Sequence, residues 1–348
     1  MPEDSNAPLP LELVLKVFNV AASSSSQSCY NLCLVSSWAR HIALPHLFTT
    51  IIIKNQVAIE PFFEQIATRP RDPPNAEFLP APQVRNLWMM TESPLPGRIG
   101  IVQISRACIN LTNIAMTTSI FHELARSTKG LGPGPRRPVR VSAGAVPLHV
   151  QRPTPFPGAP TLPFGTVAPL PAAPPPALAH SYFLETPRPD AKLSILLLDI
   201  KQHWEGAMVV ERHLGGSPRL FRHITHLRLD KQPIWGLHLG YFGRLTHFAV
   251  PYTNPEHPLL PSLETRIHGN QGLPPLQAVV VVLWTDIVKS ELVQEVQGWV
   301  ARMRAVNDSA YVVESISTGL QEEWEDEAGG GLSIWDRAVI FTNSLNRR

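Results

Sequence analysis

The sequence contains little cysteine, since only Cys29, Cys33 and Cys108 occur in 348 residues. An odd number of thiols makes no even disulfide framework, and a chain of this length with 44% hydrophobic residues needs none. No apolar run approaches the ~18 residues of a membrane-spanning helix, and the acidic, polar start MPEDSNAP is unlike a signal peptide. We therefore expect reduced thiols and an intracellular protein, in the cytoplasm or the nucleus.

A strong charge of either sign is also missing, because the net charge is +2, and no basic stripe with interleaved aromatics suggests nucleic acid. The chain has neither a G-x-x-x-x-G-K-[ST] phosphate loop nor a G-x-S-x-G turn. The pattern Cys29-x3-Cys33-x7-His41-x4-His46 has zinc-ligand letters, but its central gap is shorter than the ~12 residues of a zinc finger. We expect no catalytic residue, metal or cofactor, and we interpret scattered histidines such as His247 as surface groups.

The chain does have a strongly apolar segment near its start, over residues 9–50. Pro10 lacks an N–H and fits the first turn of a helix, where Glu12 complements the helix dipole. Apolar residues follow at helical spacing, but Leu13 and Val20 fall off that stripe, so the helix is apolar nearly all round. Such a helix has to be buried on two sides.

Two more helices are predicted in the same segment. Serines at positions 23–28 can cap a second helix, because a hydroxyl accepts from the free N–H groups of a first turn. A third helix with Trp38 and Ala43 should end before Pro45, since the residue before a proline is pushed out of the α region. Three helices in about 40 residues bury too small a core to be stable alone. We therefore expect a partner protein to cover their remaining apolar side chains.

Four groups of residues in this segment keep the order of a known motif: Leu9-Pro10-x-Glu12-Leu13, Val17-Phe18, Leu34-Val35-Ser36-Ser37-Trp38 and Leu44-Pro45-x-Leu47-Phe48. Over residues 8–52 the chain thus resembles an F-box, most of all those of the large fungal F-box families. The resemblance implies three helices that dock on the Skp adaptor of a cullin-type (SCF) ubiquitin ligase. The residues that it places at or directly behind that interface are Leu9, Pro10, Leu13, Phe18, Val35, Trp38, Pro45, Leu47 and Phe48. The alternative is a generic helical cap on the next domain.

The middle of the chain, residues 131–190, has a different composition. It holds 16 of the 36 prolines and no acidic residue before Glu185. Such a segment favours extended polyproline conformations and buries too little to order itself. We expect a disordered insertion, and a retained intron is an alternative. The PxxP spacings Pro157-x-x-Pro160 and Pro171-x-x-Pro174 suggest an SH3 or WW ligand, but they lack a flanking arginine.

On both sides of this insertion, at 53–130 and 191–346, an apolar-x-x-apolar-x-apolar pattern recurs. It occurs at Val84-Leu87-Met89, Leu111-Ile114-Met116, Leu193-Leu196-Leu198, Ile224-Leu227-Leu229, Leu245-Phe248-Val250 and Leu276-Val279-Val281. Its starting residues are 27, 82, 31, 21 and 31 apart, close to a leucine-rich-repeat period once the insertion is removed. Thr225-His226 and Thr246-His247 also repeat at matching positions. The pattern predicts a degenerate leucine-rich-repeat-like α/β domain, with an ordinary α/β domain as the alternative.

The last third predicts a βαβ unit. Residues 276–284 form a valine-rich run typical of a strand buried on both faces. Ser290 could cap a helix to about Val306, and residues 311–316 alternate as a second strand. A strand, a helix and a strand in this order favour a parallel sheet. The acidic run at 322–327, which precedes three glycines, is interpreted as a solvated loop, with a basic partner as a weaker alternative.

These observations lead to an expected class, α+β or α/β, with an N-terminal three-helix F-box and a repeat-like α/β domain. The expected function is a substrate receptor of a ubiquitin ligase. Its helices would bind the Skp adaptor and the cullin complex, and its second domain would bind a target protein. The alternatives are a repeat-domain scaffold without a ligase role and, less favoured, an α/β enzyme of unrecognised type.

Overall fold

A computed structural model describes residues 9–55, 58, 62, 80–90, 104, 107–127, 192–200, 219–233, 239–268 and 275–345. The proline-rich segment expected at 131–190 lies outside the described residues. Among the helices of the described residues, none is long and apolar enough to cross a bilayer.

Three short helices open the described chain: α1 (Leu11–Ser24), α2 (Ser26–Val35) and α3 (Ser37–Leu47). The side chain of Ser25 caps α2 by accepting from the amide of Ser28, and the side chain of Ser36 caps α3 by accepting from Ala39. Their shared core is small and consists of Ala22, Cys29, Cys33 and Ala43. The serine caps therefore separate three helices at the positions that the apolar pattern predicts.

The expectation that Pro45 ends the third helix is wrong, because α3 continues to Leu47 with Pro45 inside it. A proline in the last turn removes only the hydrogen bond to the carbonyl four residues earlier, that of the exposed His41. Beyond it the amide of Phe48 donates to Leu44 O at 3.4 Å, and the hydroxyl of Thr49 donates to Pro45 O at 3.0 Å. These bonds continue the helical turn past the proline.

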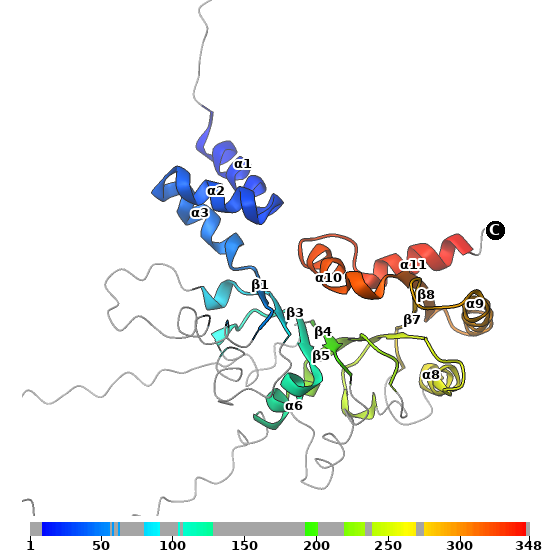
Figure 1. Ribbon diagram of the computed structural model, residues 1–348. Helices are drawn as coiled ribbons and strands as arrows, with labels where there is room; N and C mark the ends of the chain where they lie inside the picture. The colour runs from blue at the N-terminus through cyan, green and yellow to red at the C-terminus, as the bar shows by residue number, and fades with distance from the viewer. Residues whose placement is uncertain are drawn as a thin grey trace, which may run out of the picture. The chain divides into compact units, whose positions relative to one another are not determined.

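The rest of the described chain is an α/β domain built on an eight-stranded parallel sheet (Figure 1). Its strands are β1 (Thr50–Ile53), β2 (Asn86–Met89), β3 (Asn113–Thr117), β4 (Leu193–Leu198), β5 (Ile224–Leu229), β6 (His247–Pro251), β7 (Ala278–Trp284) and β8 (Ala310–Ser315). They lie side by side in chain order, and each pairs parallel with the next. β3 pairs with β4, so the segments on both sides of the proline-rich region form one sheet.

The first face of the sheet carries the main core and is packed by α6 (Thr118–Ser127), α8 (Leu259–Ile267) and α9 (Ser290–Arg304). Short 3₁₀ turns precede several strands at Ala81–Gln83, Arg219–Arg222 and Leu239–Tyr241. One residue of each strand from β2 to β7 is aligned with the next on this face: Leu87, Ile114, Ile195, Leu227, Phe248 and Val279. The recurring apolar pattern therefore coincides with strands β2 to β7 and, except in β4, with the side chains that face the main core.

In β4 the expected triplet is wrong after Leu193. The register shifts between Leu193 and Ser194, so Ile195 and Leu197 join the first face. Leu196 and Leu198 pack on the opposite face. The sequence LSILLL is apolar at every position after the serine, so no alternation indicates which residues point inward.

The second face of the sheet is covered by two C-terminal helices, α10 (Leu320–Ala328) and α11 (Ile334–Leu345), which follow a 3₁₀ turn at Ser317–Gly319 (Figure 1). The acidic run therefore does not form the solvated loop that its composition suggests. Leu320, Trp324 and Ala328 are four residues apart, which places them on one side of α10 against the sheet. The carboxylates of α10 lie on several sides of the helix, so some of them also face the sheet.

The predicted βαβ unit is present as β7, α9 and β8, with β7 and β8 parallel. The predicted cap is wrong, because Lys289 is the N-cap residue of α9 and makes no side-chain capping bond. Ser290 lies one position later, inside the first turn. Val296, Trp299, Val300 and Met303 form the buried side of α9, as the apolar spacing predicts.

Candidate interaction surfaces

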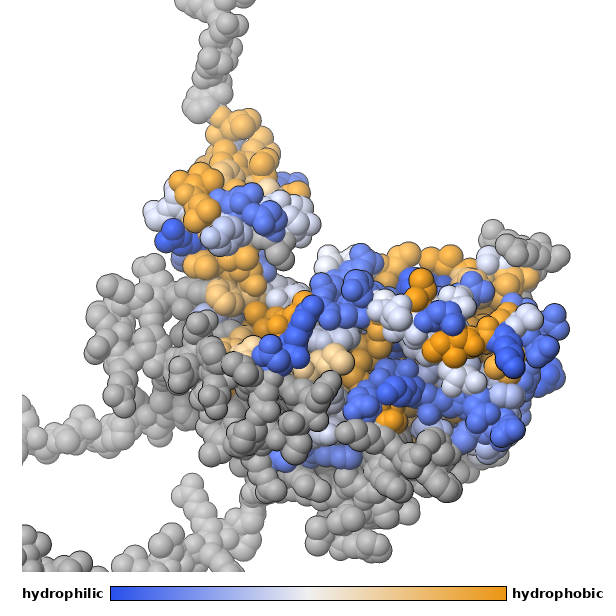
Figure 2. All heavy atoms as spheres, viewed as in Figure 1, coloured by the Kyte–Doolittle hydropathy of each residue, from blue (hydrophilic) through white to orange (hydrophobic). Residues whose placement is uncertain are grey.

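The three N-terminal helices expose an unusual number of large apolar side chains. Leu9 is 68% exposed, Leu13 50% and Val35 66%. The full set, which we call the helical apolar surface, is Leu9, Leu11, Leu13, Val17, Val20, Tyr30, Leu34, Val35 and Trp38. Figure 2 shows the same property as hydrophobic colouring over α1. Many exposed apolar side chains on so small a unit are typical of a protein-interaction site.

The nine residues expected at an adaptor interface fall into two groups. Exposed ones are Leu9, Pro10, Leu13, Val35 and Trp38. Half-buried ones are Phe18, Pro45, Leu47 and Phe48.

Contacts between helices explain the half-buried group. Phe18 of α1 meets Trp38 of α3 edge to face, with ring centroids 5.2 Å apart. Leu47 packs on the small helical core and Phe48 on the main core of the sheet domain. These contacts fix the helices, and the exposed group other than Trp38 stays open to solvent.

Sequence reasoning left part of the helical apolar surface out of the interface: Leu11, Val17, Val20, Tyr30 and Leu34. The observation that could have included Leu11, Val17 and Val20 is the apolar character of the first helix on all sides. A helix that a core of four small residues covers on one side only must expose the others.

A charged cluster lies between the second face of the sheet and its covering helices. Arg228 of β5 is 4% exposed, and Nη1 of its guanidinium pairs with Oε1 of Glu323 on α10. Arg337 of α11 pairs with the same carboxylate, and the hydroxyl of Ser315 on β8 donates to it. Burial alone would raise the pKa of Glu323, but the charges of Arg228 and Arg337 and the hydrogen bonds from Ser315 and Arg228 together outweigh it and lower that pKa. Glu323 of α10 thus links this helix to β5, β8 and α11 through ion pairs and a hydrogen bond.

Two histidines stack beside this cluster. His226 and His247 lie in register on β5 and β6, with ring centroids 4.1 Å apart, and Trp335 of α11 meets both rings edge-on at 5.3 Å. Burial, the charge of His247 and that of Lys192 lower the pKa of His226 to about 3. Burial and Lys192 also lower the pKa of His247. The interpretation of His247 as a surface group is therefore wrong, since the ring is packed under α11.

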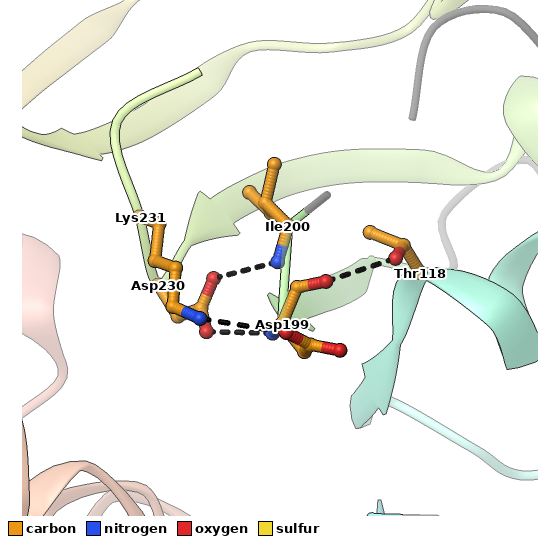
Figure 3. Close-up of polar contacts among 5 residues, drawn as sticks. All are labelled: Thr118, Asp199, Ile200, Asp230 and Lys231. Atoms are coloured by element: carbon orange, nitrogen blue, oxygen red, sulfur yellow. Dashed lines mark hydrogen bonds and ion pairs between the residues drawn. The ribbon is translucent and has the colours of Figure 1, made fainter. Parts of the chain in front are cut away.

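The carboxyl ends of β3, β4 and β5 hold a polar group of residues (Figure 3). The carboxylate of Asp230 accepts from the amides of Asp199 at 2.6 Å and Ile200 at 3.4 Å. The hydroxyl of Thr118 donates to Asp199 O at 3.0 Å, and Lys231 pairs with the Asp199 carboxylate at 3.4 Å. Asp199 has a φ of 51°, in the left-handed region that few non-glycine residues adopt.

Ligands of parallel α/β sheets bind at this edge of the strands, but here its polar side chains bind neighbouring loops. Gln232 after β5 accepts from the amides of Thr253 at 2.7 Å and Asn254 at 2.9 Å after β6. Asp286 after β7 accepts in the same way from the amide of Ser317 after β8. The repeated arrangement indicates that Asp230 also holds a loop, where the strands diverge and backbone pairing ends.

The cysteine and histidine pattern of the helices does not assemble a zinc site. Cys29 donates from its thiol to Ala43 O at 3.0 Å, and His46 Nε2 lies 3.2 Å from Asn19 Oδ1. Within the part of the chain that the structure describes, no three His, Cys, Asp or Glu residues are placed to hold a metal ion. All three cysteines are free and buried.

Comparison with known proteins finds no match, so the functional proposal rests on these surfaces. No protein-family model, curated protein or solved structure matches the chain.

Proposed function

We propose that the chain is a substrate-receptor subunit of a cullin-type ubiquitin ligase, in which α1, α2 and α3 bind a Skp adaptor. The observation that carries the proposal is the helical apolar surface, with Leu9, Leu13, Val35 and Trp38 exposed on a unit of three short helices. The order of residues over 8–52, which resembles an F-box, identifies the partner.

The energetics favour a partner on this surface. Apolar area removed from water contributes about 25 cal/mol per Å², and a stable interface buries about 800 Å² on each side. Leu13 lies on α1, Val35 is the last residue of α2 and Trp38 lies in the first turn of α3. A partner that covers these side chains therefore contacts all three helices. Their own core is too small to cover these side chains.

We further assign the sheet domain to the leucine-rich-repeat-like type and propose that it holds the target. Three features support this assignment: the strands follow chain order, all are parallel, and one apolar row runs across them in register. The domain contributes position and no chemistry. It raises the local concentration of a target near the ubiquitin-charged enzyme, as a tethered binding module does.

Co-purification of the full chain with a Skp adaptor tests the proposal. Leu13→Asp puts a charge into the helical apolar surface at a half-exposed position, so the chain should stay folded and bind the adaptor at least about 30-fold more weakly, the effect of losing a ~2 kcal/mol interface residue. Ile287→Asp is the matched control, because Ile287 is 57% exposed on the sheet domain. It should leave adaptor binding unchanged.

Two results would contradict the assignment. Equal adaptor binding by the wild-type chain and by folded Leu13→Asp would show that the interface lies elsewhere. A folded wild-type chain that captures no Skp adaptor would favour the scaffold without a ligase role.

A further inference from the structure

Helix α10 is an acidic helix that lies on a basic part of the second face. Four of its nine residues are glutamates and one is an aspartate. Glu323 pairs with Arg228 below it, and the charge of Arg228 also acts on the half-buried Glu327. Burial nevertheless raises the pKa of Glu327. The charges of helix and sheet are therefore complementary.

Few other contacts attach α10 to the sheet. Trp324 meets Trp88 of β2 edge to face, with centroids 5.4 Å apart, and packs beside Leu196. Asn86 Nδ2 donates to Ala328 O at 3.2 Å. The neighbouring α11 is anchored differently, since Ile334, Ala338 and Thr342 are each at most 1% exposed. Helix α10 is thus attached by its aromatic side chain Trp324, by the partly buried Leu320 and Ala328, and by one charged cluster.

Glycines stand at both ends of α10. Gly319 precedes the helix, and Gly329, Gly330 and Gly331 follow it. Gly330 has a φ of 97°, which side chains rarely tolerate, and a Cβ on Gly331 would meet Asp326 Oδ2 at 2.2 Å. Hinges of moving segments consist of a few such residues that absorb changes of φ and ψ. The chain therefore allows α10 to swing once the ion pair between Glu323 and Arg337 of α11 is released.

Helix α10 does not supply a hydrogen-bond acceptor to every donor that it covers. Arg228 Nε and Nη2 and Trp88 Nε1 are buried, and they have no hydrogen-bond partner within the described residues. A buried donor without an acceptor costs about 1–3 kcal/mol. An occupant with acceptors placed for these donors would bind more tightly than α10.

We propose that the patch formed by Asn86, Trp88, Leu196 and Arg228 is the surface that holds the target, and that it takes an acidic helix with an aromatic anchor. In the free chain α10 occupies the patch and is displaced by a target helix of the same chemistry. The identification of the occupant as a target rests on the proposed function.

Competition between α10 and a separate helix decides the proposal. A tethered segment acts at an effective concentration of about millimolar, so wild-type α10 excludes a weakly binding peptide. Trp324→Ala in the full chain removes the aromatic anchor of α10 and leaves the patch intact. The probe is a fluorescein-labelled peptide of residues 317–331, measured by anisotropy. We expect Trp324→Ala to bind it at least about tenfold more tightly than the wild-type chain does.

Two controls separate this effect from general loosening. Glu322→Ala changes an exposed carboxylate of the same helix and should bind the peptide as weakly as the wild-type chain. A peptide that carries Glu323→Gln and Trp324→Ala should bind the Trp324→Ala chain at least about tenfold more weakly than the unmodified peptide. Equal weak binding of the unmodified peptide by the wild-type and Trp324→Ala chains overturns the proposal.

Hydrogen exchange on the wild-type chain decides the same question without any variant. The amides of α10 should exchange through a local opening while those of β4 to β7 stay protected. Exchange of α10 amides only by global unfolding would make the helix a fixed part of the core and overturn the proposal. Neither experiment involves the adaptor, so a failure here is distinguishable from a failure of Leu13→Asp to weaken adaptor binding.

Discussion

The hydroxyl of Thr342 closes the outer edge of the sheet at Val312. It accepts from the Val312 amide at 2.9 Å and donates to the Val312 carbonyl at 3.0 Å, and both groups are buried. β8 is the last strand in the sheet order, and an edge strand presents unpaired backbone groups to other chains. α11 thus supplies from one side chain the two bonds that a ninth strand would make here.

Thr342→Val should lower the free energy of unfolding by about 2–4 kcal/mol, because the valine has the same shape and leaves an amide and a carbonyl buried without a partner. Urea unfolding measures the change. Thr342→Ser is the matched control: it keeps the hydroxyl and should lose about 1 kcal/mol, the value of one buried methyl group. Equal stability of the valine variant and the wild-type chain would mean that the edge hydrogen bonds contribute nothing.

Acid should destabilise the chain through the stacked histidines. The pKa of His226 is lowered to about 3 and that of His247 is also lowered, whereas both would titrate near 6.5 in an unfolded chain. Below pH ~6.5 the unfolded chain therefore binds more protons than the folded one. Stability should be complete above pH ~6.5 and fall as the pH drops toward 4, as the melting temperature across this range would record.

Replacement of the two histidines tests this origin. His226→Gln combined with His247→Gln should flatten the fall in melting temperature between pH 6.5 and 4. His268→Gln, at an exposed position, should leave it as steep as in the wild-type chain. An equally steep fall in the double variant would assign the acid sensitivity to other groups.

The buried thiols should be inert. Burial and the neighbouring Cys33 raise the pKa of Cys29 to about 11, and burial raises the pKa of Cys108 to about 12. The thiolate is the reactive form, and burial also keeps the reagent from Cys33. The native chain at pH 8 should therefore react with Ellman's reagent at none of its three cysteines, and all three should react in denaturant. Rapid reaction of one thiol in the native chain would reveal local opening at that position.

Strands β2 to β8 could be predicted from the sequence because most of their residues are buried, whereas β1, which is mostly half-buried, lies outside the recurring pattern. Continuous apolar runs such as residues 278–284 are typical of parallel sheets, and a recurring spacing separated the strands. The same property hid the register of β4, where consecutive leucines face opposite sides. Alternation between polar and apolar residues fixes a register, and this strand has almost none.

The second face could not be predicted for a different reason. The acidic composition of 322–327 favours solvent. The helix lies on the sheet because Leu320, Trp324 and Ala328 pack there and because Glu323 pairs with Arg228, 95 positions earlier. The repeated Thr-His pairs were visible in the sequence. Their stacking follows only when β5 and β6 are known to be adjacent and in register. Contacts of this kind depend on tertiary structure, so local patterns do not show them.

The loop after β4 offers the last test, which also bears on the enzyme alternative. Asp230→Ala removes the acceptor that holds the Asp199 and Ile200 amides, and should lower the free energy of unfolding by about 1–3 kcal/mol because these donors lose their partner. Asp199→Asn keeps a residue that tolerates the left-handed φ of 51° and removes the charge from an exposed ion pair with Lys231. It should stay within about 0.5 kcal/mol of the wild-type chain by urea unfolding. If Asp199→Asn instead increased stability strongly, the Asp199 carboxylate would be held at an energetic cost, as catalytic groups often are, and this edge of the sheet would become a candidate active site.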